Sequence, residues 1–330
     1  MNEEKHPLTF LNKVYLMVLL FVSILFHYFG ERHFILIAFR FTPAIVLLLP
    51  ALLLLTLSLT LKRKIDAAMA TVTCLLVLFN FFDLRLRGRQ EPIALGQKLQ
   101  IVSWNIHHSY KGAQKTAQDL QKLNADIILL QECSPVPKNK WPDPLPHIKS
   151  ALPKYHCVRS RSLAIVSRYP LTKLGEEKIS IHRPALLAKA KIGKQEVTIM
   201  NVHLYVNTPG KPQLRQQWYK PWNFLNDLIN VRQDAADILS DLLGEIKGPL
   251  IVGGDLNTTP NSLICQKLES KLQDCFKSAG FGFGLTYSAK FPLWRIDHLY
   301  VSDHLEPLHC QVKDLTSSDH KPLLAQILLK

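Results

Sequence analysis

Charged residues are scarce in this chain, and its cysteines are few and irregularly placed. Only 20% of the 330 residues are Asp, Glu, Lys or Arg, against 47% hydrophobic residues. This excludes a disordered polyelectrolyte, because there is ample apolar surface to bury. The six cysteines form no Cys-x-x-Cys pair and no regular spacing, so neither a zinc site nor a disulfide framework is indicated. We expect them to be ordinary buried thiols.

The charge that is present is unevenly distributed. The formal net charge is +14, from 40 Lys and Arg against 26 Asp and Glu. Residues 1–90 contain only ten basic and five acidic residues, mostly between long uncharged runs. The remaining 240 or so residues suit one large soluble domain. We therefore predict a membrane anchor over residues 1–90 and a single soluble domain over residues 91–330.

Three apolar runs in the first part predict three transmembrane helices, at about 14–30, 41–61 and 65–82. The second run has 21 consecutive uncharged residues, enough to span a bilayer at 1.5 Å per residue. The third is the shortest in its uncharged part and includes Asn80, so whether it spans fully stays open. Lys62-Arg63-Lys64, between the second and third runs, predicts a tight hairpin at the lipid headgroups.

Two other interpretations of the apolar runs are disfavoured. A cleaved signal peptide is disfavoured, because the first run lacks a small-residue cleavage site and Glu3 and Glu4 precede it. A buried helical core is disfavoured, because three such runs in succession exceed what a soluble domain usually encloses. The orientation is not decided by charge, since five basic residues flank the helices on either face.

From Lys98 onward the pattern changes to short apolar strands that alternate with helices, which predicts an α/β fold. We expect strands at 99–105, 126–132, 164–167, 185–192, 197–204, 250–255, 297–301 and 322–328, and helices at 116–124, 231–243 and 262–278. Residues 205–230 contain three prolines and no clear period, so we expect a long loop over the functional face.

Polar residues that bind metals or move protons fall repeatedly where a predicted strand ends. They are Asn105, Glu132, His203, Asp255, Asn257, Asp297, Asp319 and His320. Any one of them alone would be read as a helix cap or a turn former. If the strands lie side by side, however, their ends converge at one rim. Several carboxylates in so small a volume repel one another unless a cation or a charged substrate is present.

The motifs that contain these residues resemble the endonuclease/exonuclease/phosphatase superfamily in order and rough spacing. They are Trp104-Asn105, Gln131-Glu132, Asn201-Val202-His203-Leu204, Gly253-Gly254-Asp255-Leu256-Asn257, Arg295-Ile296-Asp297-His298 and Ser318-Asp319-His320-Lys321-Pro322. The resemblance covers about residues 98–330. It implies a four-layer α/β sandwich, in which helices flank two mixed β-sheets, and hydrolysis of phosphoester bonds. It extends to bacterial members with a three-helix anchor, whose catalytic part lies outside the cytoplasmic membrane.

The resemblance also implies a metal site. Glu132, helped by Asn105 and Asp319, would hold Mg²⁺ or Mn²⁺, hard cations that prefer oxygen ligands. Whether one or two ions bind is not decided by the sequence. His107 follows this site closely and is read as a loop histidine rather than a ligand, whereas His298 is read as structural because it should point away from Asp297.

The catalytic roles implied by the resemblance fall to five residues. Asp255 would take a proton from the attacking water, and Asn257 would orient water or phosphate. His320 would pair with Asp297, which fixes its tautomer, and His203 would donate a second hydrogen bond to the phosphate or leaving oxygen. Whether Asp255 or His320 is the general base is left open.

The substrate is argued from what surrounds the site. Trp218, Lys220 and Trp222 lie in a segment with the aromatic and basic composition of a membrane interface, and we predict that they bind substrate. A site tethered to a membrane meets lipid phosphates at high local concentration. We therefore expect a lipid-linked phosphate or pyrophosphate, or a phospholipid headgroup, as substrate and the lipid bilayer as partner.

Two other functions remain as alternatives. One is a membrane-tethered Mg²⁺-dependent nuclease; nucleic acid is not favoured as a partner, because the basic residues are dispersed. The other is a non-catalytic binding protein, which the complete set of implied catalytic residues disfavours. No protein partner can be inferred. The predicted location is a bacterial inner (cytoplasmic) membrane, with the catalytic domain facing outward.

Overall fold

A computed structural model describes residues 6–30, 36, 39, 42–88, 95–180, 183–204 and 221–330. The chain divides into two compact units. One comprises Met1–Leu84 with Asn261–Leu263, and the other comprises Arg85–Pro260 with Ile264–Lys330. The first unit is helical and the second contains nearly all of the β-structure. All six cysteines are free thiols.

The helical unit contains α1 (Pro7–Phe29), α3 (Ala44–Thr60) and α4 (Lys64–Leu76), which continues into a π-helical turn at Val77–Phe81. Helix α1 and the continuous helix Lys64–Phe81 are long and apolar enough to cross a membrane. Helix α3 has 17 residues and a length of about 26 Å. A small apolar core inside this unit includes Leu19, Leu47 and Val77.

The run at 41–61 thus forms a shorter helix than we expected. Pro43 occupies the N-cap position, and the residue before a proline is disfavoured in helical conformation, so α3 begins only at Ala44. The run at 65–82, the shortest of the three in its uncharged part, forms the continuous helix Lys64–Phe81, which is longer than α3. Its last turn, Val77–Phe81, is π-helical.

The second unit contains two six-stranded sheets and a two-stranded ribbon. In the first sheet the order is β10 (Gln273–Asp274), β12 (Asp297–Val301), β9 (Leu250–Asp255), β8 (Gln195–His203), β7 (Arg183–Ile192) and β6 (Leu171–Ser180). In the second sheet it is β13 (Leu305–Val312), β14 (Leu323–Leu329), β2 (Gln97–Asn105), β3 (Ile127–Gln131), β5 (Leu163–Ser167) and β4 (His156–Ser160). The ribbon pairs β1 (Arg85–Leu86) with β11 (Phe281–Gly282).

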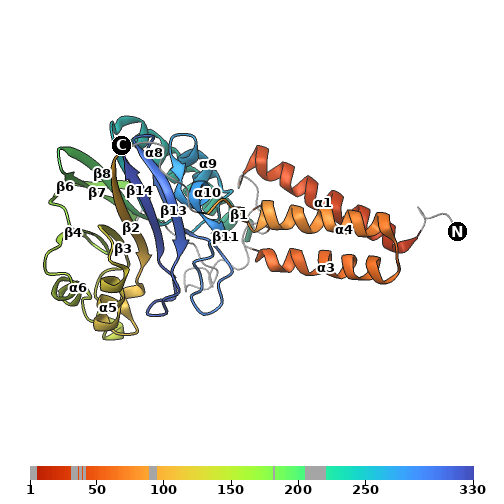
Figure 1. Cartoon of the computed structure of the whole chain (residues 1–330), viewed down its shortest axis with the longest axis horizontal. Coiled ribbons are helices and arrows are strands. Elements are labelled where there is room, and N and C mark those ends of the chain that lie inside the picture. The colour runs from red at the N-terminus through yellow and green to blue at the C-terminus, as the bar shows by residue number, and fades with distance from the viewer. Residues whose placement is uncertain are drawn as a thin grey trace. The chain divides into compact units, whose positions relative to one another are not determined.

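Both sheets are mixed, and each has one parallel pair near its centre, β8–β9 in the first and β2–β3 in the second. Their facing sides enclose the main core, to which β2 contributes Ile101, β3 contributes Leu129 and β9 contributes Ile251. Helices α5 (Ala113–Leu123) and α6 (Leu145–Ala151) pack on the outer face of the second sheet. Helices α8 (Pro221–Glu245) and α9 (Leu263–Glu269) lie on the opposite side of the sandwich (Figure 1), and α10 (Cys275–Ala279) contributes Cys275 and Phe276 to the core between the sheets.

The fold is therefore an α/β sandwich of two mixed sheets flanked by helices, as predicted. The expected helix at 262–278 is wrong, because it is divided into α9 and α10 by strand β10. The side chain of Asp274 accepts hydrogen bonds from the backbone N–H groups of Phe276 and Lys277, which caps a new helix at that point. The loop expected at 205–230 is also too long, since α8 begins at Pro221.

Candidate active site

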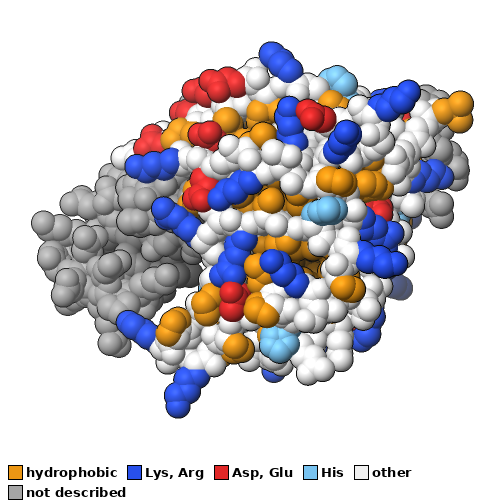
Figure 2. All heavy atoms as spheres, turned by 90° about the vertical axis from the view of Figure 1, so that its left-hand side faces the viewer, with side chains coloured by type: hydrophobic (Ala, Val, Ile, Leu, Met, Phe, Trp, Pro, Cys, Tyr) orange, Lys and Arg blue, Asp and Glu red, His pale blue; other side chains and the backbone are white. Residues whose placement is uncertain are grey.

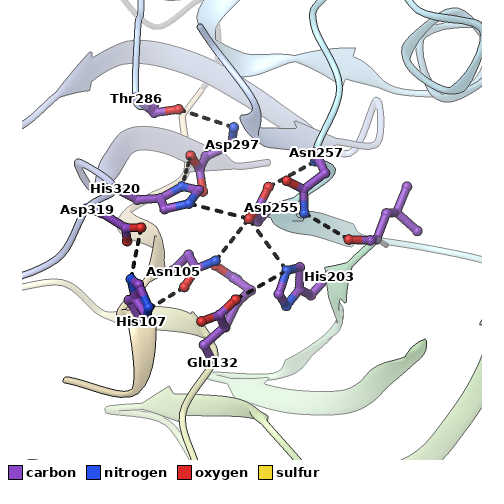
Figure 3. Close-up of polar contacts among 12 residues, drawn as sticks. Asn105, His107, Glu132, His203, Asp255, Asn257, Thr286, Asp297, Asp319 and His320 are labelled. Atoms are coloured by element: carbon purple, nitrogen blue, oxygen red, sulfur yellow. Dashed lines mark hydrogen bonds and ion pairs between the residues drawn. The ribbon is translucent and has the colours of Figure 1, made fainter. Parts of the chain in front are cut away.

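The polar residues at the strand ends come together at one edge of the sandwich (Figure 3). The parallel register places Asn105 opposite Gln131 in the second sheet and His203 opposite Asp255 in the first. Asp255 also lies opposite Asp297 across the antiparallel β9–β12 pair. The convergence follows from the topology, because parallel neighbours end at the same edge of a sheet.

The centre of the site is a buried group of two carboxylates and one imidazole. His320 Nδ1 lies 2.9 Å from Asp297 Oδ2, and its Nε2 lies 3.7 Å from Asp255 Oδ2. Burial raises the pKa of Asp255 to about 7, and the charge of Asp297 acts in the same direction. Burial lowers the pKa of His320, but the carboxylates of Asp297 and Asp255 outweigh it and raise this pKa to about 10. The imidazole is therefore cationic at neutral pH.

Asp255 is held on both of its oxygens. The amide of Asn105 donates to Oδ2 over 2.9 Å, and the backbone N–H of Asn257 donates to Oδ1 over the same distance. Asn257 lies beyond the end of β9 in a turn with a φ of 49°, so this turn, and not strand alternation, brings it beside Asp255. Its amide nitrogen donates to the carbonyl of Leu204 over 2.9 Å, which leaves the amide oxygen for a ligand.

His203 stands between two of the carboxylates. Its Nε2 lies 3.6 Å from Asp255 Oδ2 and 3.9 Å from Glu132 Oε1, and the residue is 3% exposed. Glu132 follows β3 with a φ of 52°, which turns its side chain from the strand toward His203. An imidazole in this position can donate a hydrogen bond to an anionic group that enters beside Asp255.

Two sets of ligands for a cation are available among the described residues. Asp255, Asp297 and His320 each offer an atom within 4.8 Å of the others, but all three are buried and engaged with one another or with Asn105. The carboxylates of Glu132 and Asp319 are 23% and 28% exposed. Their solvent-accessible oxygens are the hard donors that Mg²⁺ and Mn²⁺ prefer, and such ions keep several waters. Two residues of the predicted set, Glu132 and Asp319, thus offer open donors that suit a divalent cation. The third, Asn105, is 2% exposed, and its amide already contacts Asp255 and the backbone N–H of His107.

Buried hydrogen bonds fix the site residues from behind. The hydroxyl of Ser318 donates to the backbone carbonyl of Asn105 over 2.7 Å. Thr286 Oγ1 accepts from the backbone N–H of Asp297 over 3.3 Å. Beneath the rim, the amide of Gln131 donates to Asn201 Oδ1 over 2.7 Å, which joins the two sheets. These bonds hold the side chains of the site in place before any ligand arrives.

Besides Thr286, three further residues near the site were not assigned to it from the sequence. The ring of Tyr287 packs 4.8 Å from that of His320, between centroids. His107 Nδ1 lies 2.9 Å from Asp319 Oδ2, so this loop histidine belongs to the site. Arg232 of α8 is buried, and it donates to the carbonyl of Asn257 over 3.4 Å and to the hydroxyl of Thr258. Only the position of His107, two residues after Asn105, was a signal in the sequence.

The predicted substrate-binding residues are not tested by this geometry. Trp218 and Lys220 lie outside the described residues, and Trp222 is described only as part of the backbone of α8. His298, read as structural, is 1% exposed on β12, and its Nε2 lies 2.9 Å from the carbonyl oxygen of Thr258 and so faces away from the site.

Comparison with known proteins identifies the family. The model of the Endonuclease/Exonuclease/phosphatase family matches residues 102–320, more than half of the chain. The chain belongs to this family, whose members are phosphoester hydrolases, typically dependent on a divalent metal. Comparison with curated proteins finds no match.

Solved structures share the fold. A family protein from Bacteroides thetaiotaomicron matches with a TM-score of 0.55 and 17% identity, over 72% of this chain and 100% of its own. A mannosyl-6-phosphatase of the same organism matches with a TM-score of 0.53 and 18% identity, over 70% and 99%. D. rerio TDP2, solved with a single-strand DNA product, matches with a TM-score of 0.50 and 18% identity, over 70% and 99%.

Proposed function

We propose that this protein is a membrane-anchored, Mg²⁺- or Mn²⁺-dependent hydrolase of a lipid-linked phosphate or pyrophosphate, or of a phospholipid headgroup. The observation that carries the proposal is the buried group of Asp255, His320 and Asp297 beside the more open carboxylates of Glu132 and Asp319. The first group can activate water, and the second can hold a cation against phosphate oxygens.

Asp255 is the better candidate for the general base. Its pKa of about 7 allows it to accept a proton from water near neutral pH, whereas the pKa of about 10 keeps His320 protonated. The His320 imidazolium then donates a hydrogen bond to phosphate, and Asp297 holds its orientation. His203 is a second donor, and the free amide oxygen of Asn257 orients the attacking water.

Glu132, Asn105 and Asp319 are the proposed metal ligands. When bound, a divalent cation supplies positive charge that stabilises the phosphate oxygens as water attacks phosphorus. Asn105 ties this set to the base, because its amide also donates to Asp255. The Nδ1–H of His107 donates to Asp319 Oδ2 and so orients that carboxylate.

The helical unit supports membrane attachment by its exposed side chains as well as its length. Large apolar residues of α1 and α3 face outward, among them Met17, Phe21 and Leu53, each at least 60% exposed. A soluble bundle buries its apolar stripe and exposes a polar one. Outward apolar side chains around a small core are instead typical of helices that lie in lipid. We place this anchor in a bacterial inner membrane, with the catalytic unit facing outward.

A membrane-tethered nuclease is the second candidate, and the TDP2 structure with its DNA product favours it. Nuclease function requires an extended basic groove. Figure 2 shows one face of the molecule, on which Lys and Arg side chains are interspersed with hydrophobic and acidic ones and form no continuous patch. This face therefore offers no continuous basic groove for a nucleic acid.

The experiment that tests the function is a Mg²⁺-dependent phosphate-release screen on the purified full-length protein in detergent. The substrates are polyprenyl pyrophosphates, sphingomyelin, phosphatidylglycerol phosphate and oligonucleotides. Products in which the phosphate stays esterified to an alcohol release no free phosphate, and they are detected by mass spectrometry. We expect hydrolysis of a lipid substrate and none of DNA or RNA. Cleavage of oligonucleotides or plasmid alone would establish the nuclease instead, and no cleavage of any substrate would favour a binding protein.

The orientation has its own test. Added protease should cleave the catalytic unit in intact spheroplasts if that unit faces outward. Cleavage that requires lysis would reverse the proposed orientation without affecting the proposed chemistry.

A further inference from the structure

The β1–β11 ribbon exposes an apolar pair on one of its faces. Leu86 and Phe281 are directly opposite each other in the antiparallel register, so their side chains project from the same face. Leu86 is 60% exposed and Phe281 is 68% exposed. A further hydrogen bond, from the N–H of Gly88 to the carbonyl of Gly280 over 2.9 Å, extends the pairing past the ladder. The ribbon thus holds two large apolar side chains side by side, both of them exposed to solvent.

Basic residues flank this apolar pair. Arg85 and Arg87 precede and follow Leu86, and Arg87 is exposed. By strand alternation, the side chains of Arg85 and Arg87 project from the face opposite to Leu86. With the apolar pair at the level of the acyl chains, the guanidinium groups lie on the headgroup side, which is the composition typical of a surface that lies on a membrane.

The ribbon follows the apolar helix Lys64–Phe81 closely in the chain, which limits its distance from the end of that helix. Arg85 follows Phe81, the last residue of the apolar helix Lys64–Phe81, by four residues. Four residues reach at most about 14 Å when fully extended. If that helix crosses a bilayer, the ribbon lies within this distance of the helix end, where the headgroups and water meet.

The same ribbon leads directly to the active site. Thr286 follows Gly282, the last residue of β11, by four residues, and its hydroxyl accepts from the backbone N–H of Asp297. Tyr287 comes next and packs on His320. The rim of the site is therefore at most about 14 Å of chain from the ribbon.

We propose that the β1–β11 ribbon is the lipid-contacting surface of the catalytic unit. Leu86 and Phe281 enter the boundary between headgroups and acyl chains. The contact holds the active site at headgroup depth, where a phosphate attached to lipid is presented. This proposal rests on the proposed membrane anchor, and it goes beyond it by assigning a second, interfacial contact to the catalytic unit.

The direct test places a fluorophore at the ribbon in the full-length protein reconstituted into nanodiscs of anionic phospholipid. The label is attached to Phe281→Cys. Leu174→Cys is the control, because Leu174 is also an apolar residue of a strand, β6, and is 49% exposed. Labelling of the unsubstituted protein measures the background from native thiols. We expect nitroxide-bearing lipids to quench the label at position 281 at least about threefold more than the label at 174, and aqueous iodide to show the reverse.

Every outcome of this test bears on the proposal. A label at 281 that iodide reaches as readily as the control overturns the lipid contact. A label shielded from both quenchers also overturns it, because a protein surface then covers the ribbon. If alkaline carbonate extracts the protein from its membranes, the anchor fails and the lipid contact fails with it.

Rates of hydrolysis distinguish a failure of the proposed lipid contact from a failure of the proposed substrate. Leu86→Ser/Phe281→Ser should reduce hydrolysis of a lipid substrate in the same bilayer by about tenfold, with hydrolysis of the soluble bis(p-nitrophenyl) phosphate unchanged. Leu174→Ser should change neither rate. Lipid quenching at 281 without hydrolysis of any lipid leaves the surface intact and refutes only the proposed substrate. Equal loss on both substrates would show that the ribbon supports the fold and would refute the proposal.

Discussion

The indole N–H of Trp104 donates to the backbone carbonyl of His320 over 2.9 Å, across 216 positions of sequence. Trp104 is fully buried on β2, one residue before Asn105, whereas His320 lies just before β14. The bond therefore ties the first motif of the site to the last. It sets the position of the backbone from which the imidazole reaches Asp297 and Asp255.

Trp104→Phe should lower kcat as well as stability. The substitution leaves the His320 carbonyl buried without its donor, at a cost of about 1–3 kcal/mol, and a displaced catalytic group costs up to about a hundredfold in rate. Tyr155→Phe is the control, because it removes a 2.8 Å bond from a side chain to a backbone carbonyl, that of Ala125, away from the site, together with the bond that the same hydroxyl accepts from Arg168. Thermal unfolding and steady-state kinetics should separate them. Equal kcat values for the two variants would refute the positioning role.

Asp255→Asn should reduce kcat by about 10²–10⁴-fold without unfolding the protein. The amide has the shape of the carboxylate but cannot accept the proton of water. Asp241→Asn, an exposed position on α8, is the control and should leave kcat unchanged. Wild-type hydrolysis of any phosphoester by the Asp255 variant would show that the site is assigned wrongly.

Removal of divalent cations with EDTA should abolish hydrolysis, and Mg²⁺ or Mn²⁺ should restore it. Glu132→Gln removes one of the two accessible carboxylates, so we expect the metal concentration for half-maximal activity to rise by at least about tenfold. Glu177→Gln, exposed on β6, should not shift it. Activity that survives exhaustive chelation would contradict the metal requirement. An unchanged titration with Glu132→Gln would place the cation on other ligands.

His298 should make the stability of the catalytic unit fall at alkaline pH. Burial lowers its pKa, but Cys265 and Asp274 outweigh this and raise the pKa from 6.5 to about 10. Because the folded-state pKa is the higher one, the stabilisation is complete below about pH 6.5 and is lost as the pH rises through about 10.

The measurement is the thermal unfolding midpoint between pH 6 and pH 10 in detergent. His298→Gln should be less stable than wild type at pH 6, and the difference should shrink toward pH 10. His304→Gln, at an exposed position, should run parallel to wild type. A constant difference between His298→Gln and wild type would mean that the imidazole is neutral in the folded protein.

Local pattern was sufficient to predict the strands that carry the site. Strands β2, β3, β8, β9 and β12 are buried along their whole length or nearly so, and each leads into a polar residue that local sequence marks as an end. The half-exposed strands β4 and β6 escaped prediction, because their side chains lack a continuous apolar run. The sequence pattern predicts a single helix at 262–278, because its helical period continues through Asp274. In the structure the side chain of Asp274 instead caps a separate helix, α10.

The family motifs, the contrast between an apolar first part and a more charged second part, and the groups able to bind metal or move protons can all be read from the sequence. Which of these groups are buried together and which stay open depends on the tertiary structure. It also brought Arg232, Thr286 and Tyr287 to the site. Their contribution depends on contacts between segments far apart in the chain, and such contacts leave no period or spacing in the local sequence.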